Sequence, residues 1–264
     1  MFDGSKWLLI GALVVATLAV GACRGESQPP PPQHKAEPAA KPTAPVALRA
    51  DTLDREGIIL AALHATTSAA LGRDDREAQR ELNGRKFAVR IRFGCPGMKD
   101  PDRGWTYDAE KQVIRVKVQS MLTEESLPAS DLLRSGYEGA AGFIVGKPWL
   151  LTAGCPVGGF ASVGANEPTI VIAQLFTQAD SRVQRPQHSY ELTKPLKREE
   201  QPGDGLDLVL SGRLAELPDG RSIHCAAQDG PPACIISATI DRVAIEMPTT
   251  GDVLGEWGAG ATAQ

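Results

Sequence analysis

The chain begins with a hydrophobic run and then changes character at a single cysteine. Residues 7–20, WLLIGALVVATLAV, are almost entirely apolar, whereas residues 24–46 are rich in Pro and Ala and poor in large apolar side chains. The apolar run is shorter than the roughly 20 residues that span a bilayer and is typical of a signal-peptide core. The Pro-rich segment cannot bury enough surface to fold and favours extended polyproline II, which predicts a disordered, semi-rigid tether over residues 23–47.

Two helices are expected at the start of the body that follows. Between residues 51 and 71, side chains recur near helical spacing at Leu53, Leu60, Leu63, Thr67 and Leu71. Asp51 or Thr52 would cap this helix, and Gly72 would end it. A second, charged helix is expected over residues 74–82, ended by Asn83–Gly84.

From residue 84 onward the period of the pattern changes to two, which indicates strands with one buried face. Residues 86–93 and 113–119 both alternate apolar with polar or basic side chains. Turn residues separate these two strands, and we expect Trp105 and Tyr107 to lie in the connecting loop. A meander would pair these two strands antiparallel.

Later segments also predict short strands. Residues 143–151 read as two strands around a Gly-Lys-Pro turn, and the continuous apolar run 169–176 is typical of a central strand buried on both faces. Residues 206–214 and 221–225 suggest a hairpin with Asp219–Gly220 in its turn. A second hairpin is expected from residues 233–247 and 252–258.

Short strands with frequent turns favour an α+β fold, mainly antiparallel β, as a sandwich or a partly open barrel with one or two N-terminal helices. The body suits a single domain, residues 48–264, helical over 48–83 and β-rich over 84–258. The formal net charge of -4 in 264 residues is modest, and the charges are mixed. That balance argues against nucleic-acid binding, which usually requires a basic excess.

Four cysteines lie in the body, and an even number in an exported chain favours two disulfides. Three pairings are conceivable. Cys225 and Cys234 flank the turn-rich segment AAQDGPPA, so we expect them to pair with each other. Cys95 and Cys155, each in a Gly-Cys-Pro sequence after a strand-like run, would form the second disulfide.

The fifth cysteine closes the sequence Val20-Gly21-Ala22-Cys23, which resembles the lipobox of bacterial lipoproteins. The resemblance implies that residues 1–22 are a signal peptide, that Cys23 receives a diacylglycerol, and that cleavage leaves Cys23 as an acylated N-terminus carrying palmitate. Several acyl chains anchor a protein almost permanently. Arg24 in place of Asp implies the outer membrane of a Gram-negative envelope. The alternative interpretation is an uncleaved membrane anchor with a chance cysteine.

Four pieces of the body, RFGCPG, GWTYD, KPWLL and LDLVLSGR, are similar to a group of uncharacterised proteobacterial lipoproteins. The similarity extends over much of the body. No activity is attached to that group, so it implies the same anchored location and no mechanism.

The sequence contains no nucleophile elbow, zinc-protease motif, phosphate loop or dinucleotide fingerprint. His34 lies in the tether, and His64 reads as a packed or surface residue of a helix. His188 lies beside Ser189 and Glu191, but adjacency in sequence is no indication of a triad. We therefore expect no catalytic residues.

Metal binding is also the weaker interpretation. His224, Cys225 and Cys234 offer three zinc ligands, but a structural site usually has four, and an oxidising compartment favours a disulfide. Asp204 and Asp207 in the sequence GDGLDL lack the dense oxygen ligands of a calcium loop. We expect no metal and no cofactor.

One charged feature suggests a binding surface. If the strands 86–93 and 113–119 pair, their outward side chains form a basic patch of Lys86, Arg90, Arg92, Arg115 and Lys117. Such a patch would meet phosphates, a polyanionic polymer or an acidic protein surface. The competing interpretation is an ordinary solvated face, partly paired with Asp and Glu.

The sequence therefore predicts a lipid-anchored protein of the cell envelope, whose folded body is held away from the membrane by its tether. We expect it to face the periplasm and to bind an envelope protein or anionic polymer without catalysis. The alternatives are an exported hydrolase whose site is assembled from dispersed residues, with His188 or His224 involved, and a small-ligand-binding β domain.

Overall fold

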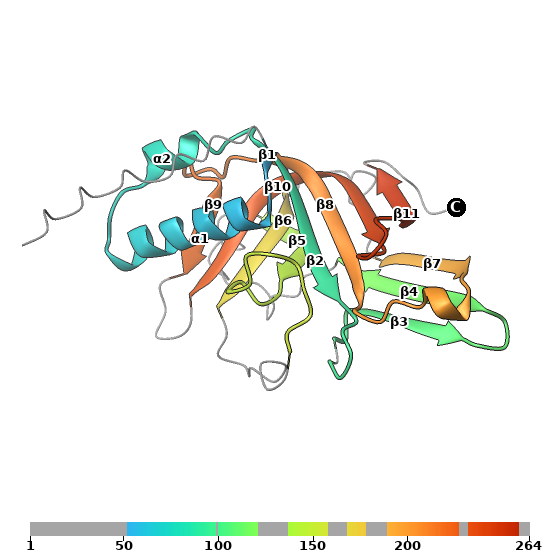
Figure 1. The fold of residues 1–264 in the computed structure, drawn as a ribbon. Helices are drawn as coiled ribbons and strands as arrows, with labels where there is room; N and C mark the ends of the chain where they lie inside the picture. Colours follow the sequence, from blue (N-terminus) through green and yellow to red (C-terminus); the bar gives the residue numbers. More distant parts are fainter. Residues whose placement is uncertain are drawn as a thin grey trace, which may run out of the picture. The chain divides into compact units, whose positions relative to one another are not determined.

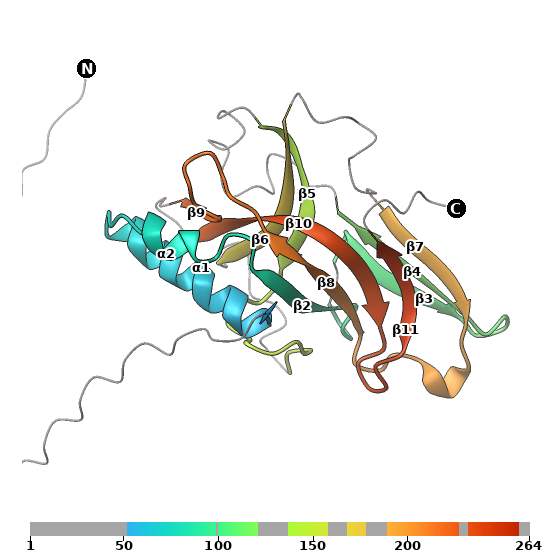
Figure 2. The same cartoon turned by 90° about the horizontal axis from the view of Figure 1, so that it is seen from above.

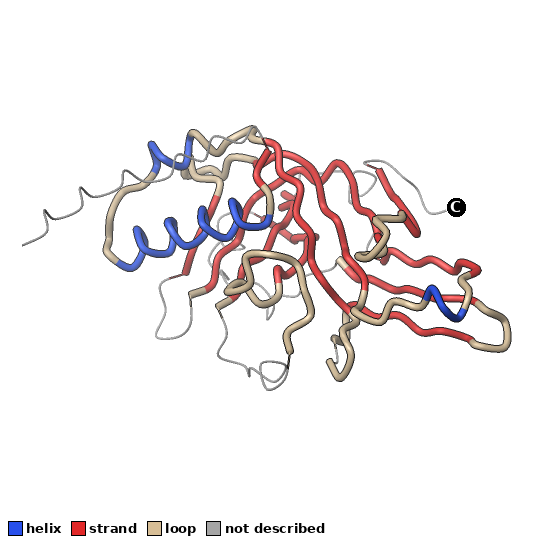
Figure 3. Tube along the Cα trace, viewed as in Figure 1, coloured by secondary structure: helices blue, strands red, loops and turns tan. Residues whose placement is uncertain are grey.

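The structure is a computed structural model, and it describes residues 52–98, 100–120, 137–157, 168–177, 189–226 and 232–258. Figures 1 and 3 show the arrangement of helices and strands. The elements in chain order are β1 (Thr52–Leu53), α1 (Arg55–Ala70), α2 (Arg76–Arg80), β2 (Lys86–Phe93), β3 (Arg103–Asp108), β4 (Val113–Gln119), β5 (Tyr137–Val145), β6 (Thr169–Thr177), β7 (Ser189–Pro195), the 3-10 turn η4 (Arg198–Glu200), β8 (Leu206–Leu214), β9 (Ile223–Ala226), β10 (Ala233–Glu246) and β11 (Val253–Gly258).

The larger sheet is organised around β10. Its strand order is β1-β2-β8-β10-β6-β5, and β9 and β11 also pair with β10. The first half of β10 pairs with β6 and β9, and the second half pairs with β8 and β11. The pairs β1–β2 and β6–β10 are parallel, and the other pairs are antiparallel. The expected α+β class with mainly antiparallel strands is confirmed.

A second sheet, β3-β4-β7, contributes to the same core. Ile114, Val116 and Val118 of β4 are buried in one cluster with Val243 and Ile245 of β10. This agrees with the alternation along β4, where every second side chain points inward. Figure 2 shows the small sheet beside β11 and the end of β10, with α1 over the opposite end of the large sheet.

Helix α1 begins later than expected. Thr52 pairs with Lys86 in β1, so the predicted cap at Asp51 or Thr52 is wrong for Thr52, and Asp51 lies outside the described residues. Asp54 caps the helix instead, because its side chain accepts a hydrogen bond from the Gly57 backbone N–H at 2.9 Å. Gly72 follows the helix with a φ of 61°, which confirms it as the stop.

The helix packs through its smaller side chains rather than through its leucines. Ile58, Ala62 and Ala65 are buried against the sheet, whereas the exposed leucines of this segment are Leu60, Leu63 and Leu71. Small residues allow α1 to lie close to β9 and β10, where Thr66 Oγ1 is 3.0 Å from Cys234 Sγ. Within the described residues, neither helix combines the length and the apolar character needed to cross a bilayer.

Three expectations about local structure need correction. The charged helix is shorter than predicted, since α2 covers Arg76–Arg80. Trp105 and Tyr107 lie in strand β3 and not in a loop, because β3 pairs with β4 along its whole length. The second of the two strands expected in 143–151 is absent, and residues 146–151 follow β5 as turn and loop.

The expected hairpin of β8 and β9 is also wrong, although both strands exist. Each pairs with β10 in succession, β8 with Ala238–Glu246 and β9 with Ala233–Ile236. Gly220, with a φ of 82°, turns the chain between them, but that turn does not bring the two strands together. The hairpin of β10 and β11 is confirmed, and β6 is confirmed as a central strand between β5 and β10.

Both expected disulfides are present. Cys225 and Cys234 lie directly opposite each other on β9 and β10. Cys95 and Cys155 join the end of β2 to the segment that follows β5. The second disulfide therefore fastens a segment without regular hydrogen bonding to the rigid sheet.

Candidate functional site

The structure divides the predicted basic patch between two sheets. Strand β2 pairs with β1 and β8, and β4 pairs with β3 and β7, so the assumed pairing of β2 with β4 is wrong. Lys86, Arg90 and Arg92 therefore belong to the large sheet, and Arg115 and Lys117 belong to the small one.

The arginines of β2 are matched by carboxylates that the sequence analysis did not identify as their partners. Arg92 binds both carboxylate oxygens of Asp207, at 2.6 and 3.2 Å. Arg90 lies 3.1 Å from Glu246, which is also 3.7 Å from Arg242. Each acidic residue adjoins an apolar run, Asp207 before residues 208–210 and Glu246 after residues 243–245, and a charge in that position was the available signal.

The basic residues of the small sheet lie beside a shallow hollow of about 430 Å³ on its outer face. Lys117 forms an ion pair with Glu191 at 3.3 Å, and Arg115 is the neighbouring exposed cation. Hydrogen bonding from Ser189, followed by Lys117, lowers the pKa of Glu191 below its ordinary value. Both members of this pair are largely exposed, so the pair contributes little to stability.

The other selected residues do not converge on a shared site. His64 is exposed on α1, and His224 is half-buried on β9. The sulfurs of Cys225 and Cys234 are used in a disulfide. Cys23, His34 and His188 lie outside the described residues. In the part of the chain that the structure describes, no three His, Cys, Asp or Glu side chains are grouped as metal ligands.

Asp204 and Asp207 both serve Arg92 rather than a common cation. The Asp204 carbonyl oxygen accepts a hydrogen bond from Arg92 Nη1 at 3.0 Å. The Asp207 side chain is almost fully buried beneath the same guanidinium. The two residues therefore hold the chain before β8 against the end of β2.

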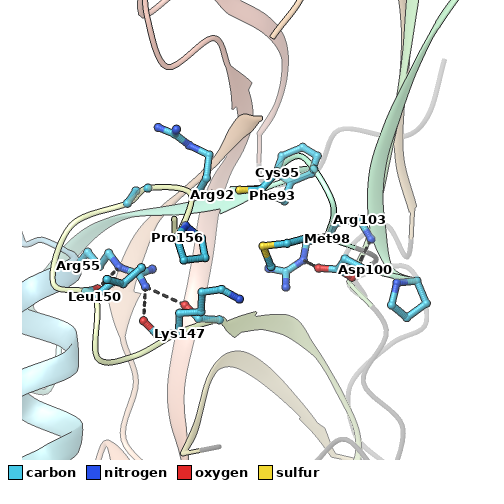
Figure 4. A pocket seen from close by; sticks show the side chains of 15 residues that line it. Arg55, Arg92, Phe93, Cys95, Met98, Asp100, Arg103, Lys147, Leu150 and Pro156 are labelled. Carbon is cyan, nitrogen blue, oxygen red and sulfur yellow. Dashed lines mark hydrogen bonds and ion pairs between the residues drawn. The ribbon is translucent and has the colours of Figure 1, made fainter. Parts of the chain in front are cut away.

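A different site lies where β2 ends. We define the strap as residues 146–157, the segment that follows β5 and contains Cys155. A cavity of about 190 Å³, the strap cavity, lies between the strap, the end of β2, Met98 and residues 100–103 (Figure 4). Its walls come from segments that are far apart in sequence.

The strap is fixed at both of its ends. At its start, Arg55 donates hydrogen bonds to the carbonyl oxygens of Gly146, Lys147 and Leu150 at 2.8, 3.1 and 2.8 Å. Arg55 also donates to the Arg90 carbonyl at 3.2 Å, which ties the strap to β2. At the other end, the disulfide of Cys155 with Cys95 completes the attachment. The strap wall of the cavity is therefore fixed in place by hydrogen bonds at one end and by a disulfide at the other.

Four cations and one carboxylate line the strap cavity. The cations are Arg55, Arg92, Arg103 and Lys147, and the carboxylate is Asp100. Arg103 Nε lies 2.8 Å from Asp100 Oδ2, and Arg103 Nη1 donates to the Ile144 carbonyl at 3.0 Å. In Figure 4 the Lys147 side chain extends from the strap into the space between Arg55 and Asp100.

Gly94 shapes the wall beside β3. Its φ is 64°, and a Cβ at this position would overlap the Trp105 indole. Trp105 Nε1 donates a hydrogen bond to the Gly94 carbonyl oxygen at 3.1 Å. A glycine is needed here for both the left-handed backbone and the close approach of the ring.

The outer side of the strap is apolar. Trp149 and Leu151 are each 40 % exposed, and Val157 is 83 % exposed. The sequence analysis interpreted this segment as a strand and therefore missed its surface. The available signal was the sequence Gly146-Lys147-Pro148, whose three residue types are all depleted in strands.

Comparison with known proteins finds no match to this chain among family models, curated proteins or solved structures.

Proposed function

We propose that this chain is a lipid-anchored protein of the cell envelope whose folded body binds an envelope protein or polymer without catalysis. The lipobox resemblance supports diacylglycerol and palmitate on Cys23 after removal of residues 1–22. It also supports attachment to the outer membrane on its periplasmic side. At about 3.1 Å per residue, the Pro-rich tether would allow the body to reach partners tens of ångströms from the membrane.

One observation carries the binding proposal: the strap is fixed to the sheet and still presents apolar side chains to solvent. Trp149 and Leu151 are exposed on the strap, which also carries Lys147, so one short segment combines apolar side chains with a positive charge. Aromatic residues are enriched in protein interfaces and often carry most of the binding energy. Because the strap is held in place, a partner would lose little affinity in ordering it.

The test is crosslinking in cells that express the full chain, followed by capture from the envelope. We expect Trp149→Ser/Leu151→Ser to lose the crosslinked partner that the native protein retains. The control is Leu63→Ser/Leu71→Ser, which removes two exposed leucines from the helical region instead. That control should leave the crosslink intact.

The result that overturns the binding surface is an unchanged crosslink in the strap variant. Loss of the partner only in the helical control would assign the surface to α1. If the native protein yields no specific crosslink while mass spectrometry confirms acylated Cys23, the binding function itself is wrong.

A further inference from the structure

We infer that the strap cavity is an anion-binding site that takes a phosphate or carboxylate group, with Lys147 as its direct ligand and Arg55 as a supporting charge. The inference deepens the proposed function, because it names the chemistry of the ligand at the strap. It rests on that function only for the biological source of the anion.

Arg55 carries a buried charge with no paired carboxylate among the described residues. The residue is 7 % exposed, and the four hydrogen bonds of its side chain all go to neutral backbone carbonyls. Among the described residues, no ion pair includes Arg55. A buried charge is costly unless an opposite charge compensates it. An anion in the adjoining cavity would supply that compensation.

The electrostatic surroundings of Arg55 support the same conclusion. Burial lowers the pKa of Arg55 below its ordinary value, while the field of Asp207 acts in the opposite direction and that of Arg103 adds to the lowering. Asp207 is already engaged at both oxygens by Arg92. The carboxylate that helps Arg55 from a distance is therefore shared with a closer cation.

Lys147 carries the second charge of the cavity that lacks a partner among the described residues. Its ammonium carries three N–H donors and has no hydrogen-bond or ion-pair partner among the residues that the structure describes. Its φ of 53° is left-handed, which is uncommon for a residue other than glycine and recurs at ligand sites. The strap thus holds a half-buried cation at the cavity in a costly backbone conformation.

The remaining charges of the cavity are balanced locally. Asp100 accepts hydrogen bonds from Arg103 Nε and from the backbone N–H groups of Asp102 and Arg103. Arg92 is matched by Asp207. Within the described part of the chain, the two lining charges without a paired carboxylate are those of Arg55 and Lys147, so the cavity favours an anion over a neutral or cationic group.

The size of the cavity limits what enters it. Its volume of about 190 Å³ corresponds to about six waters at roughly 30 Å³ each. Pockets for whole drug-sized ligands are larger, at about 300–1,000 Å³. The cavity therefore suits the anionic end of a molecule, with the rest of that molecule lying outside it.

The experiment is calorimetric titration of the purified, lipidated full chain in detergent with inorganic phosphate and, separately, with acetate. Low ionic strength is used because salt screens such contacts. We expect Lys147→Gln to weaken binding at least about tenfold, as loss of a charged hydrogen bond does. Lys147→Glu should abolish binding, and Lys147→Arg should restore it.

The matched control is Lys86→Gln, which removes an exposed lysine from the opposite end of β2 and should leave both titrations unchanged. Melting curves of all four variants establish that each one is folded. Binding of phosphate alone or acetate alone would support the site and identify which anion it prefers. Failure of the native protein to bind either anion, or equal binding by Lys147→Gln, would overturn the inference.

These outcomes are independent of the proposed function. If the strap variant loses its crosslinked partner but the native protein binds no anion, the binding function stands and the anion site falls. If the native protein binds phosphate through Lys147 but captures no partner, the site stands and the envelope-binding function falls.

Discussion

Single acidic residues decide how the outer face of the large sheet behaves. Asp207, Glu246 and Glu256 each stand beside an arginine from another part of the chain, and the pairs are Arg92–Asp207, Arg90–Glu246 and Arg242–Glu256. A face that looks basic along β2 alone is balanced once β8, β10 and β11 are beside it. The value of each pair depends on its exposure, since water screens an exposed pair.

The first stability prediction concerns the most buried of these pairs. The side chain of Asp207 is 6 % exposed and that of Arg92 is 13 % exposed. We expect Asp207→Asn to lower the free energy of unfolding by about 3 kcal/mol, because Arg92 would remain buried without its counter-charge. Urea denaturation measures this loss.

The control for Asp207→Asn is Glu191→Gln, which removes the exposed partner of Lys117. Its unfolding midpoint should stay close to that of the native protein, because both side chains are solvated. If the two variants unfold at the same urea concentration, burial does not govern these ion pairs.

At the scale of elements, the strap depends on attachments rather than on a hydrogen-bond ladder. Arg55 holds its beginning, and the disulfide of Cys95 with Cys155 holds its end. The other disulfide, which joins Cys225 to Cys234, connects β9 and β10 beside α1. The two crosslinks therefore stabilise different parts of the domain, which allows one to serve as a control for the other.

We expect Cys95→Ser/Cys155→Ser to weaken phosphate binding, because the released strap would no longer keep Lys147 at the cavity. Its unfolding free energy should fall by about 2–5 kcal/mol, the usual cost of losing a native disulfide. Calorimetric titration and urea denaturation measure the two effects.

Cys225→Ser/Cys234→Ser should also lose stability but keep the affinity for phosphate. Equal loss of affinity in both variants would mean that global destabilisation, and not release of the strap, weakens the site.

At the scale of the whole molecule, β10 makes the two ends of the large sheet into one unit. Its first half carries β6 and β9, and its second half carries β8 and β11. The small sheet and α1 contribute to the same apolar core. The proposed anchor and tether would present this body as a single unit, so removing the anchor should change its location without changing its fold.

We expect Cys23→Ser to abolish incorporation of labelled palmitate. The variant should then either appear in the soluble fraction or retain its uncleaved signal peptide. Arg24→Asp is the matched variant, because it keeps the cysteine and alters only the sorting position. It should remain acylated but shift to the inner membrane of a Gram-negative host. Palmitate labelling of the Cys23→Ser variant would contradict the lipobox interpretation.

Much of the local structure could be predicted because it depends on neighbouring residues. The alternation along 86–93 and 113–119 identified β2 and β4, and the apolar run 169–176 identified β6. The disulfide of Cys225 with Cys234 followed from the short turn between two strands, and the other disulfide followed by elimination. Each of these signals lies within a short window of sequence.

The pairing of strands and the strap cavity could not be predicted in the same way. Alternation shows that β2 has a buried face, but it does not say whether β4 or β8 lies beside it. The Arg55 guanidinium reaches carbonyl groups 91 to 95 residues away, and its role depends entirely on that long-range approach. By itself, the sequence determined strands such as β2, β4 and β6 and the two disulfides, and it predicts the anchor, because periodicity and spacing are local properties. Only the tertiary structure decided which charges are paired and which remain free, because that depends on segments brought together by the shared core.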